Sequence, residues 1–367
     1  MIGIEHDHGP TPIVAPGELE RAVDALVAAG APGAVVVVRD RDVITRAAGG
    51  FADLQSGRPM RADLRFRAGS ITKAFVATAV LQLADEGWLA LSDSLERWVP
   101  GALPYADDVQ LRQLLNHTSG VPDYVRLVDK ALHGSEDERL ADYTPHELVA
   151  LVYDEPPRFA PGSAWAYSNT GYALLGLVIE AVTAEPLEDE LADRILSPLG
   201  LAHTSLPVDE IEIPPPMAHG YAPPLGPHGD LVQGPLVDVT VQNPSWAWAS
   251  GALVSTLDDL TRFFAGLLGG ELLSPALLAE MQTTVAVPPD AIPVPIYDAY
   301  GLGLVAVDVP RGRLYGQPGG IPGYLSAVLG TPDGQRQLGV MVNLGELAPQ
   351  ALYDALVAVA RALAVQL

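Results

Sequence analysis

Strand-type segments lie near both ends of this 367-residue chain, and a mainly helical region separates them. Near the N-terminus, the valine-rich residues 33–38 have the composition of a buried strand, and residues 43–47 can pair with them across a polar turn. Near the C-terminus, four further segments have strand character: 300–307, 313–315, 324–329 and 337–342. This pattern predicts an α+β fold, an α/β sandwich whose antiparallel sheet is built from both ends of the chain.

Helices are expected to flank this sheet. The amphipathic residues 17–30 and 350–366 predict two terminal helices, and Thr256 can cap a helix over residues 257–268. The region between the strand-rich ends should be an all-helical insert. Its expected helices lie at 109–115, after the capping box that starts at Thr144, and over 172–182.

The same pattern predicts how the chain divides into domains. Residues 1–73 plus 250–367 would form an α/β sheet domain, and residues 74–249 would form a mainly helical domain. We expect the active site between the two, where a cleft can form. The Pro- and Gly-rich residues 205–229 indicate a long loop.

Composition narrows the classes of function. Hydrophobic residues make up 49% of the chain, enough for a large core, and the formal net charge is −24. Such a charge repels nucleic acid and anionic membrane surfaces, so we expect neither as a partner. The absence of cysteine excludes disulfides and thiolate catalysis, and His6 and His8 form only a lone terminal pair. We therefore expect no metal and no cofactor, and we find no phosphate-binding or dinucleotide-binding motif.

The first eight residues predict the location of the protein. They have no basic start and no apolar run, so they do not form a signal peptide. No apolar stretch in the chain is long enough to span a bilayer. We expect a soluble, cytoplasmic protein, and the sequence leaves its oligomeric state open.

A serine and a lysine occur together at the start of a predicted helix. Phe75, Ala79 and Leu83 form an apolar stripe of helical period, and Ser70 lies in the first turn of that helix. Lys73 follows one turn later on the same face, which places an amine beside the hydroxyl. A serine hydroxyl becomes a good nucleophile only when a nearby group takes its proton.

Lysine can accept a proton in its neutral form, whereas arginine stays charged. The chain has 21 Lys and Arg residues, of which only Lys73 and Lys130 are lysines. Alone, the pair would also fit a simple helix cap at Ser70 and a solvated lysine. Partner motifs must therefore decide between the two interpretations.

Two further motifs could complete a site. In Tyr167-Ser168-Asn169, a tyrosine near a lysine can have a lowered pKa and act as a base, and the asparagine can bond a substrate carbonyl. The alternative is a packed tyrosine and a capping asparagine.

The Gly-rich residues 316–323 lie between two late strands, where the backbone N–H of Gly320 could join that of Ser70 in an oxyanion hole. The alternative is an ordinary hairpin.

Together these motifs resemble the serine β-lactamase and penicillin-binding-protein superfamily, and more closely its class C β-lactamase, DD-peptidase and esterase branch. The resemblance covers residues 17–366. It implies a β-lactamase/transpeptidase-like fold and acyl-enzyme chemistry. Further phrases that match that branch are 66–70, 114–120, 167–172, 250–256 and 300–304.

The resemblance also implies roles for individual residues. Ser70 would be the nucleophile, Lys73 and Tyr167 would share proton transfer, and Asn169 would orient the substrate. The N–H groups of Ser70 and Gly320 would form the oxyanion hole. Further residues expected to contact the substrate are Gln317, Gly319, Trp246 and Trp248, and for the tryptophans core packing is the alternative.

One motif departs from the family pattern. The family has Lys or His, then Thr or Ser, then Gly, whereas this chain has Gln317-Pro318-Gly319. Gln317 carries no charge, and Pro318 has neither a hydroxyl nor an N–H group. Val305 and Ala306 stand where some relatives place an arginine. We therefore expect weak activity on β-lactams and free carboxylates, and a less charged ester, amide or activated acyl substrate.

Three functions remain open. The first is a serine hydrolase that acts through an acyl-Ser70 intermediate on a small-molecule or peptide substrate. The second is an acyltransferase or peptide cyclase, in which an amine or alcohol takes the acyl group in place of water. The third is a non-catalytic binding protein that keeps the fold. The chain has no G-x-S-x-G motif, which disfavours an α/β-hydrolase.

Overall fold

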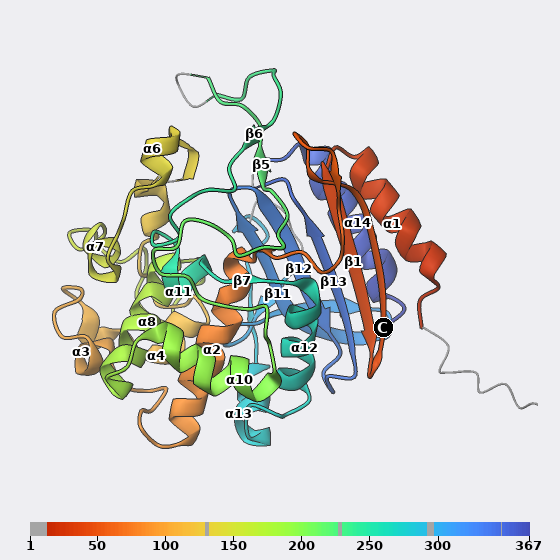
Figure 1. Ribbon diagram of the computed structural model, residues 1–367. Coiled ribbons are helices and arrows are strands. Elements are labelled where there is room, and N and C mark those ends of the chain that lie inside the picture. The colour runs from red at the N-terminus through yellow and green to blue at the C-terminus, as the bar shows by residue number, and fades with distance from the viewer. Residues whose placement is uncertain (1–12, 129–131, 227–229, 292–296, 346) are drawn as a thin grey trace, which may run out of the picture.

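The computed structural model describes residues 13–128, 132–226, 230–291, 297–345 and 347–367 (Figure 1). Its main feature is a nine-stranded sheet in the order β3-β2-β1-β13-β12-β11-β10-β9-β8, with every pairing antiparallel. The N-terminal strands are β1 (Gly33–Asp40), β2 (Val43–Asp53) and β3 (Arg58–Pro59). The C-terminal strands are β8 (Val285–Ala286), β9 (Ala299–Tyr300), β10 (Val305–Val309), β11 (Gly312–Ile321), β12 (Tyr324–Gly330) and β13 (Arg336–Val342).

Strand β1 pairs with β13, so the two ends of the chain meet inside one sheet. Ala34 lies opposite Val342, and Val38 lies opposite Leu338. The predicted α+β fold with an antiparallel sheet from both ends is therefore confirmed. Within the described parts of the chain, no helix combines the length and apolar character needed to cross a lipid bilayer.

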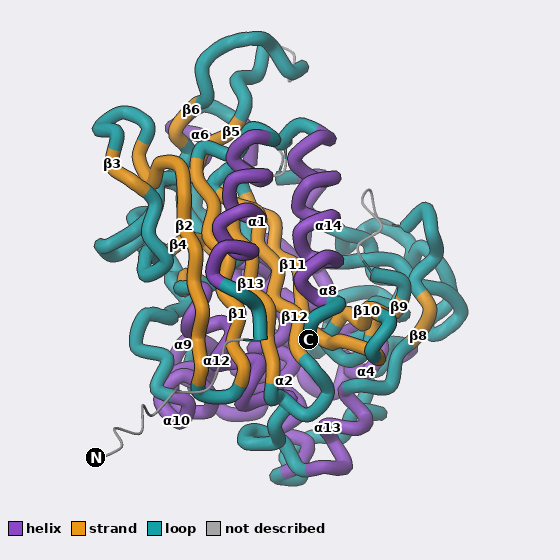
Figure 2. Tube along the Cα trace, turned by 90° about the vertical axis from the view of Figure 1, so that its right-hand side faces the viewer, coloured by secondary structure: helices purple, strands orange, loops and turns teal. Residues whose placement is uncertain are grey.

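Helices cover both faces of the sheet (Figures 1 and 2). The outer face carries the terminal helices α1 (Pro16–Ala28) and α14 (Gln350–Ala364), and their contacts with the sheet form one hydrophobic cluster. The inner face carries α2 (Thr72–Asp85) and α12 (Leu257–Leu268), which belong to the larger cluster. Helix α2 is buried along nearly its whole length, and Phe75 stacks on Phe263 at 3.6 Å between ring centroids.

Short helices and loops form most of the region between the strand-rich ends. Helix α8 (Asn169–Thr183) is the longest described there, and a two-stranded ribbon of β5 (Tyr221–Ala222) and β6 (Val237–Asp238) also lies in this region. The other helices are α3 (Leu95–Trp98), α4 (Leu111–Leu115), α6 (Glu136–Arg139), α7 (Pro145–Ala150), α9 (Leu187–Leu191), α10 (Ser197–Leu199) and α11 (Trp248–Gly251), with α13 (Pro275–Met281) beyond them. The expected all-helical insert is thus wrong in detail, because the region also contains the short strands β5 and β6.

The domain division, residues 1–73 plus 250–367 against 74–249, stays a prediction. The larger hydrophobic cluster includes Phe66 and Phe263 from the first unit and Leu174 from the second. Strands β4 (Phe66–Arg67) and β7 (Val254–Ser255) pair close to the proposed boundary.

Two late strands differ from their predicted bounds. The segment expected as one strand over 300–307 forms β9 and β10, with a turn between them. The expected strand at 313–315 is longer, since β11 continues through most of the Gly-rich segment that we expected to lie between strands. Close packing explains the glycines, because a Cβ at Gly316 would lie 1.9 Å from the carbonyl oxygen of Val328.

Candidate active site

Ser70 lies in the short 3-10 turn Gly69–Ile71, directly before α2. Gly69 has a φ of +57°, and a Cβ at this position would lie 2.6 Å from the carbonyl oxygen of Gly320. Glycine permits both the left-handed backbone and this close approach. The turn therefore packs directly against β11, and Ser70 lies between the start of a helix and a strand.

Lys73 is fully buried beneath Ser70. Its Nζ donates hydrogen bonds to Ser70 Oγ at 3.0 Å, to Asn169 Oδ1 at 2.8 Å and to the carbonyl oxygen of Ser250 at 2.6 Å. A protonated amine has three N–H donors, and these oxygens surround it from three different segments. The structure thus brings together the amine and hydroxyl that the sequence places one helical turn apart.

Tyr167 reaches the same hydroxyl from the loop that directly precedes α8. Its phenol donates a hydrogen bond of 2.8 Å to Ser70 Oγ, and Lys73 Nζ lies 4.8 Å from the ring centroid. Burial, with a further contribution from Tyr300, raises the pKa of Tyr167 well above its usual value. The lowered pKa expected from the sequence is therefore wrong, because desolvation of the buried phenol is the largest contribution and favours the neutral form.

The His117 ring packs against the ring of Tyr167. The two rings lie 4.4 Å apart between centroids, and His117 Nδ1 accepts a hydrogen bond of 3.3 Å from the backbone N–H of Ser168. Burial, and to a lesser extent Lys73, lowers the pKa of His117 well below its usual value. The imidazole is therefore neutral near pH 7, and it supports Tyr167 through packing.

Asp123 holds Asn169 in place, and the sequence analysis did not identify it. Its carboxylate accepts hydrogen bonds from the Asn169 backbone N–H at 3.2 Å and from Asn169 Nδ2 at 3.0 Å. It also accepts one from the backbone N–H of Val125 at 3.2 Å. These bonds turn Asn169 Oδ1 toward Lys73. Asp123 lies three residues after the matched 114–120 phrase, which is the only sequence signal that could have drawn attention to it.

A second unpredicted contact is the carbonyl of Ser250 on α11. Tyr124 fixes this helix, since its hydroxyl donates to the Trp246 carbonyl at 2.8 Å and lies 3.1 Å from Ser250 Oγ. Trp246 lines the cavity in front of Ser70, as expected. Trp248 instead packs in the core against Gly176, so we assign it no contact with substrate.

The third motif lies on β11 beside Ser70. Gln317 is buried, and its Nε2 donates to the Tyr300 hydroxyl at 3.2 Å. Its Oε1 has no hydrogen-bond partner among the described residues. A Cβ at Gly319 would lie 2.0 Å from the carbonyl oxygen of Ala68, so this position also requires glycine. The motif therefore allows the backbone at Gly319 to lie close to Ala68 and provides the side-chain amide of Gln317, but it provides no charged group.

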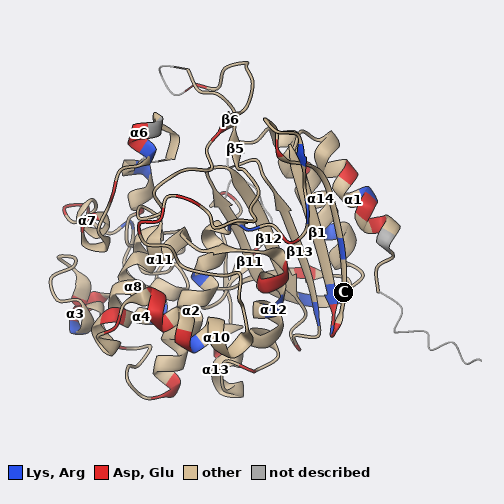
Figure 3. Cartoon of the chain, in the orientation of Figure 1, with Lys and Arg blue, Asp and Glu red and all other residues tan. Residues whose placement is uncertain are grey.

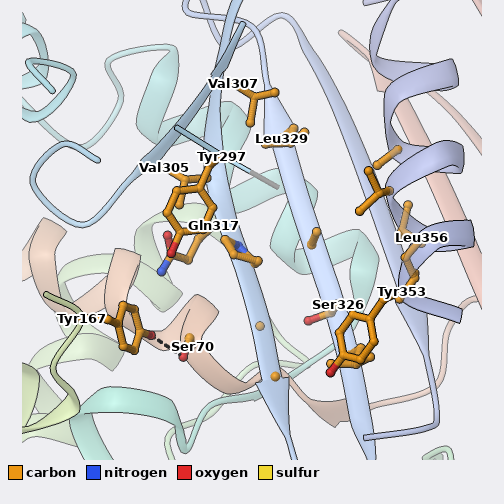
Figure 4. Close-up of a pocket in the computed structure, with 18 of the residues that line it drawn as sticks. Ser70, Tyr167, Tyr297, Val305, Val307, Gln317, Ser326, Leu329, Tyr353 and Leu356 are labelled. Carbon is orange, nitrogen blue, oxygen red and sulfur yellow. Dashed lines mark hydrogen bonds between the residues drawn. The ribbon is translucent and has the colours of Figure 1, made fainter. Parts of the chain in front are cut away.

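A cavity of about 970 Å³ opens in front of these groups (Figure 4). Ser70, Tyr167 and Asn169 line one end of it. Arg361 is the only Lys or Arg among its described lining residues, and it lies on α14. Charged residues are also absent from the nearby strands: β12 and residues 317–321 of β11 contain no Lys, Arg, Asp or Glu (Figure 3). Asp298 and Asp308 are the acidic residues of the described lining, and most of the other lining residues are uncharged.

Metal binding has no support in the described residues. They contain no group of three or more His, Cys, Asp or Glu side chains that could hold a metal ion. His6, His8 and Lys130 lie outside the described residues.

Comparisons with known proteins agree with this geometry. The Beta-lactamase family pattern matches residues 19–363. Penicillin-binding protein 4* of Bacillus subtilis (strain 168) is 28% identical over 327 residues, which cover 86% of this chain and 68% of that protein. Esterase EstB of Burkholderia gladioli is 31% identical over 333 residues, which cover 82% of this chain and 76% of the esterase.

Solved structures give the same result. The D-stereospecific amidohydrolase of Streptomyces sp. superimposes with a TM-score of 0.83 at 35% identity, over 95% of this chain and 98% of that one. The D-amino acid amidase of Ochrobactrum anthropi SV3, in complex with L-phenylalanine amide, superimposes with a TM-score of 0.82 at 29% identity, over 95% and 97% of the two chains. The resemblance inferred from the sequence motifs is confirmed, and this chain belongs to the Beta-lactamase family over nearly its whole length.

Proposed function

We propose that this protein is a serine hydrolase that cleaves ester or amide bonds through a covalent acyl intermediate on Ser70. The observation that carries the proposal is the convergence of Lys73 Nζ and the Tyr167 hydroxyl on Ser70 Oγ, at 3.0 Å and 2.8 Å. The names of the similar proteins support hydrolysis, because they include an esterase, a D-stereospecific amidohydrolase and a D-amino acid amidase. The substrate is a small molecule or peptide. The cytoplasmic location stays a prediction of the sequence.

Acylation begins when Ser70 Oγ attacks the substrate carbonyl carbon. Acylation requires Lys73 as a neutral amine, which keeps two N–H donors for Asn169 Oδ1 and the Ser250 carbonyl and takes the serine proton on its lone pair. Tyr167, whose raised pKa keeps its phenol protonated, donates a proton to the leaving oxygen or nitrogen. The proton then returns from Lys73 to Tyr167, so both groups recover their starting states.

The negative charge of the tetrahedral intermediate falls on the substrate oxygen. We assign its stabilisation to the backbone N–H groups of Ser70 and Gly320, since Gly69 packs directly against Gly320. Water then attacks the acyl-serine, gives a proton to Lys73 and forms the acid product. Lys73 returns that proton to Ser70 Oγ as the ester bond breaks.

A set of acyl probes tests the proposal. The protein is incubated with a p-nitrophenyl ester, a peptidyl thioester and a penicillin, with and without an added amine. Intact mass spectrometry then detects the acyl-enzyme, and product analysis identifies the acceptor. We expect an acyl adduct and release of the free acid. An amide product in place of the acid would indicate an acyltransferase, and no adduct with any probe would indicate a binding protein.

Penicillin should be a poor substrate compared with a neutral ester. The third motif contains Gln317 and Pro318 where relatives offer a cation and a hydroxyl. Loss of one charge-assisted pair costs about 2 kcal/mol, or roughly 30-fold in affinity for the penicillin carboxylate. We expect the double variant Gln317→His/Pro318→Thr to gain penicillin hydrolysis by about this factor, measured as kcat/KM. Native turnover at the level of a true β-lactamase would contradict this prediction.

Asp123→Asn should lower kcat/KM by about 10- to 100-fold. Within the part of the chain that the structure describes, the hydrogen bonds to this carboxylate are donated by N–H groups, so the amide introduced by the substitution would place its NH₂ against a donor. Asn169 must then turn its own NH₂ toward Lys73 and displace it. The exposed variant Asp107→Asn should keep wild-type activity.

The pH–rate profile of Asp123→Asn distinguishes misorientation of Asn169 from a general loss of folded structure. Burial raises the pKa of Asp123, so the wild-type carboxylate takes up a proton as the pH falls, and the oxygen that becomes O–H then faces N–H groups as a second donor. The variant has no such group. We expect its acid limb to move to lower pH while its maximum rate decreases, and an unchanged acid limb would contradict the assignment.

A further inference from the structure

The cavity in front of Ser70 extends beyond the catalytic groups. It continues past β11 to the outer face of the sheet, where α14 borders it (Figure 4). We call this extension the outer groove. Its main lining residues are Val307, Ala327, Leu329, Leu356, Val357 and Ala360.

The register of the sheet shows which side of β11 faces this groove. Ala327 lies opposite Val340, which belongs to the hydrophobic cluster beneath α14, so Ala327 also points to the outer face. Pro318 lies opposite Ala327, and Gly320 lies two residues further along the same face. The part of β11 nearest Ser70 therefore presents only proline and glycine to the groove.

The edge of β11 is also open at this point. Residues 312–316 pair with β10, whereas residues 317–321 pair with β12 alone among the described residues. No described strand separates Ser70 from the outer groove along that edge. A chain attached to Ser70 can thus cross β11 where the strand is narrowest.

The chemistry of the groove indicates its occupant. Leu329, Leu356 and Val357 are only half-buried, so apolar surface is available on both walls. The charged residues among the described lining of the whole cavity are Asp298, Asp308, which is paired with Arg313 at 2.7 Å, and Arg361 in the last turn of α14. The total volume of about 970 Å³ lies near the top of the range of roughly 300–1,000 Å³ for small-molecule sites, far more than an acetyl group requires.

We propose that the outer groove binds the hydrocarbon chain on the acyl side of the substrate, so that the enzyme prefers esters or amides of long, apolar acids. This inference rests on the proposed function. The leaving group must face the Tyr167 hydroxyl, and the carbonyl oxygen must face Gly320. The remaining substituent of the carbonyl carbon is the acyl chain, which is left to follow β11. Continuity with Ser70 favours a substrate chain over a second protein copy.

A series of p-nitrophenyl esters with acetyl, butyryl, hexanoyl and decanoyl chains tests this proposal. We expect kcat/KM to rise by about two- to fourfold for each methylene that enters the groove. Acetyl esters of alcohols of increasing length should show no comparable rise. A flat response to acyl length, or a response to alcohol length alone, would overturn the proposal.

Variants that fill the outer groove test whether the dependence of kcat/KM on acyl-chain length arises there. Ala360→Trp fills it from α14, and Ala327→Phe fills it from β12. Each should lower kcat/KM for the decanoyl ester by at least about tenfold and leave the acetyl ester within about twofold of wild type. Ala358→Trp, on the exposed face of the same helix, is the matched control and should leave both unchanged.

The outcomes separate the two hypotheses. If no ester acylates Ser70, the proposed hydrolase function fails. If the acetyl ester is turned over but both filling variants keep the preference for long chains, only the groove assignment fails. A filling variant that changes the mass of the protein in solution but not the chain-length response would show that the groove is an interface between copies, which also contradicts the assignment.

Discussion

Ser70→Ala is expected to abolish acyl-enzyme formation and to lower kcat/KM for a p-nitrophenyl ester by at least about 10⁴-fold. Alanine removes the Ser70 Oγ atom on which both Lys73 and Tyr167 converge, so no bond to the acyl group can form. The residual rate would come from substrate binding and the oxyanion hole alone. Intact mass after incubation with the ester measures the adduct, and absorbance measures turnover.

The control for this experiment is Ser163→Ala. Ser163 is exposed on a loop, where its hydroxyl donates to the Ala160 carbonyl at 2.7 Å. This variant should keep wild-type labelling and turnover. A labelled Ser70→Ala protein would show that another residue is the nucleophile, and the proposed mechanism would then be wrong.

Tyr167→Phe should lower kcat/KM for an amide or alkyl ester by about 10²- to 10⁴-fold. The change removes the proton donor and keeps the ring that packs against His117. A p-nitrophenolate leaving group needs no proton, so the loss on a p-nitrophenyl ester should be much smaller. The ratio of the two losses measures proton donation and is insensitive to a general loss of folding.

The pH dependence follows from the burial of the phenol. Because burial raises the pKa of Tyr167, the phenol keeps its proton up to the ordinary tyrosine value of 10.0, and ionisation of Tyr167 should not reduce the rate below that pH. The exposed variant Tyr153→Phe is the control and should behave like wild type. Equal losses on the amide and the p-nitrophenyl ester would contradict the role of Tyr167 as the acid.

Local sequence signals predicted the elements whose structure depends on near neighbours. Thr256 accepts a hydrogen bond from the backbone N–H of Asp259, and α12 begins directly after it, as expected. The bounds of β11 could not be predicted in this way. Glycine and proline usually indicate turns, but here Gly316 and Gly319 are required by contacts with Val328 and Ala68.

In the site, too, residues close together in sequence could be predicted, whereas contacts from distant segments could not. Ser70 and Lys73 are three residues apart, and Tyr167 and Asn169 are two apart, so motif spacing was enough to select them. The Ser250 carbonyl lies 177 residues from Lys73 in sequence, and any residue type could supply it. The pKa of Tyr167 depends on burial by rings from several distant segments, which no local pattern encodes.

The pairing of β1 with β13 has a consequence for synthesis. Strand β13 ends at Val342, close to the C-terminus, yet it is the neighbour that fixes the N-terminal strands in the sheet. Such long-range pairing forms slowly. A nascent chain that still lacks β11 also lacks Gly320, against which the turn around Ser70 packs. The turn around Ser70 therefore gains this packing only after residues 312–321 have been synthesised.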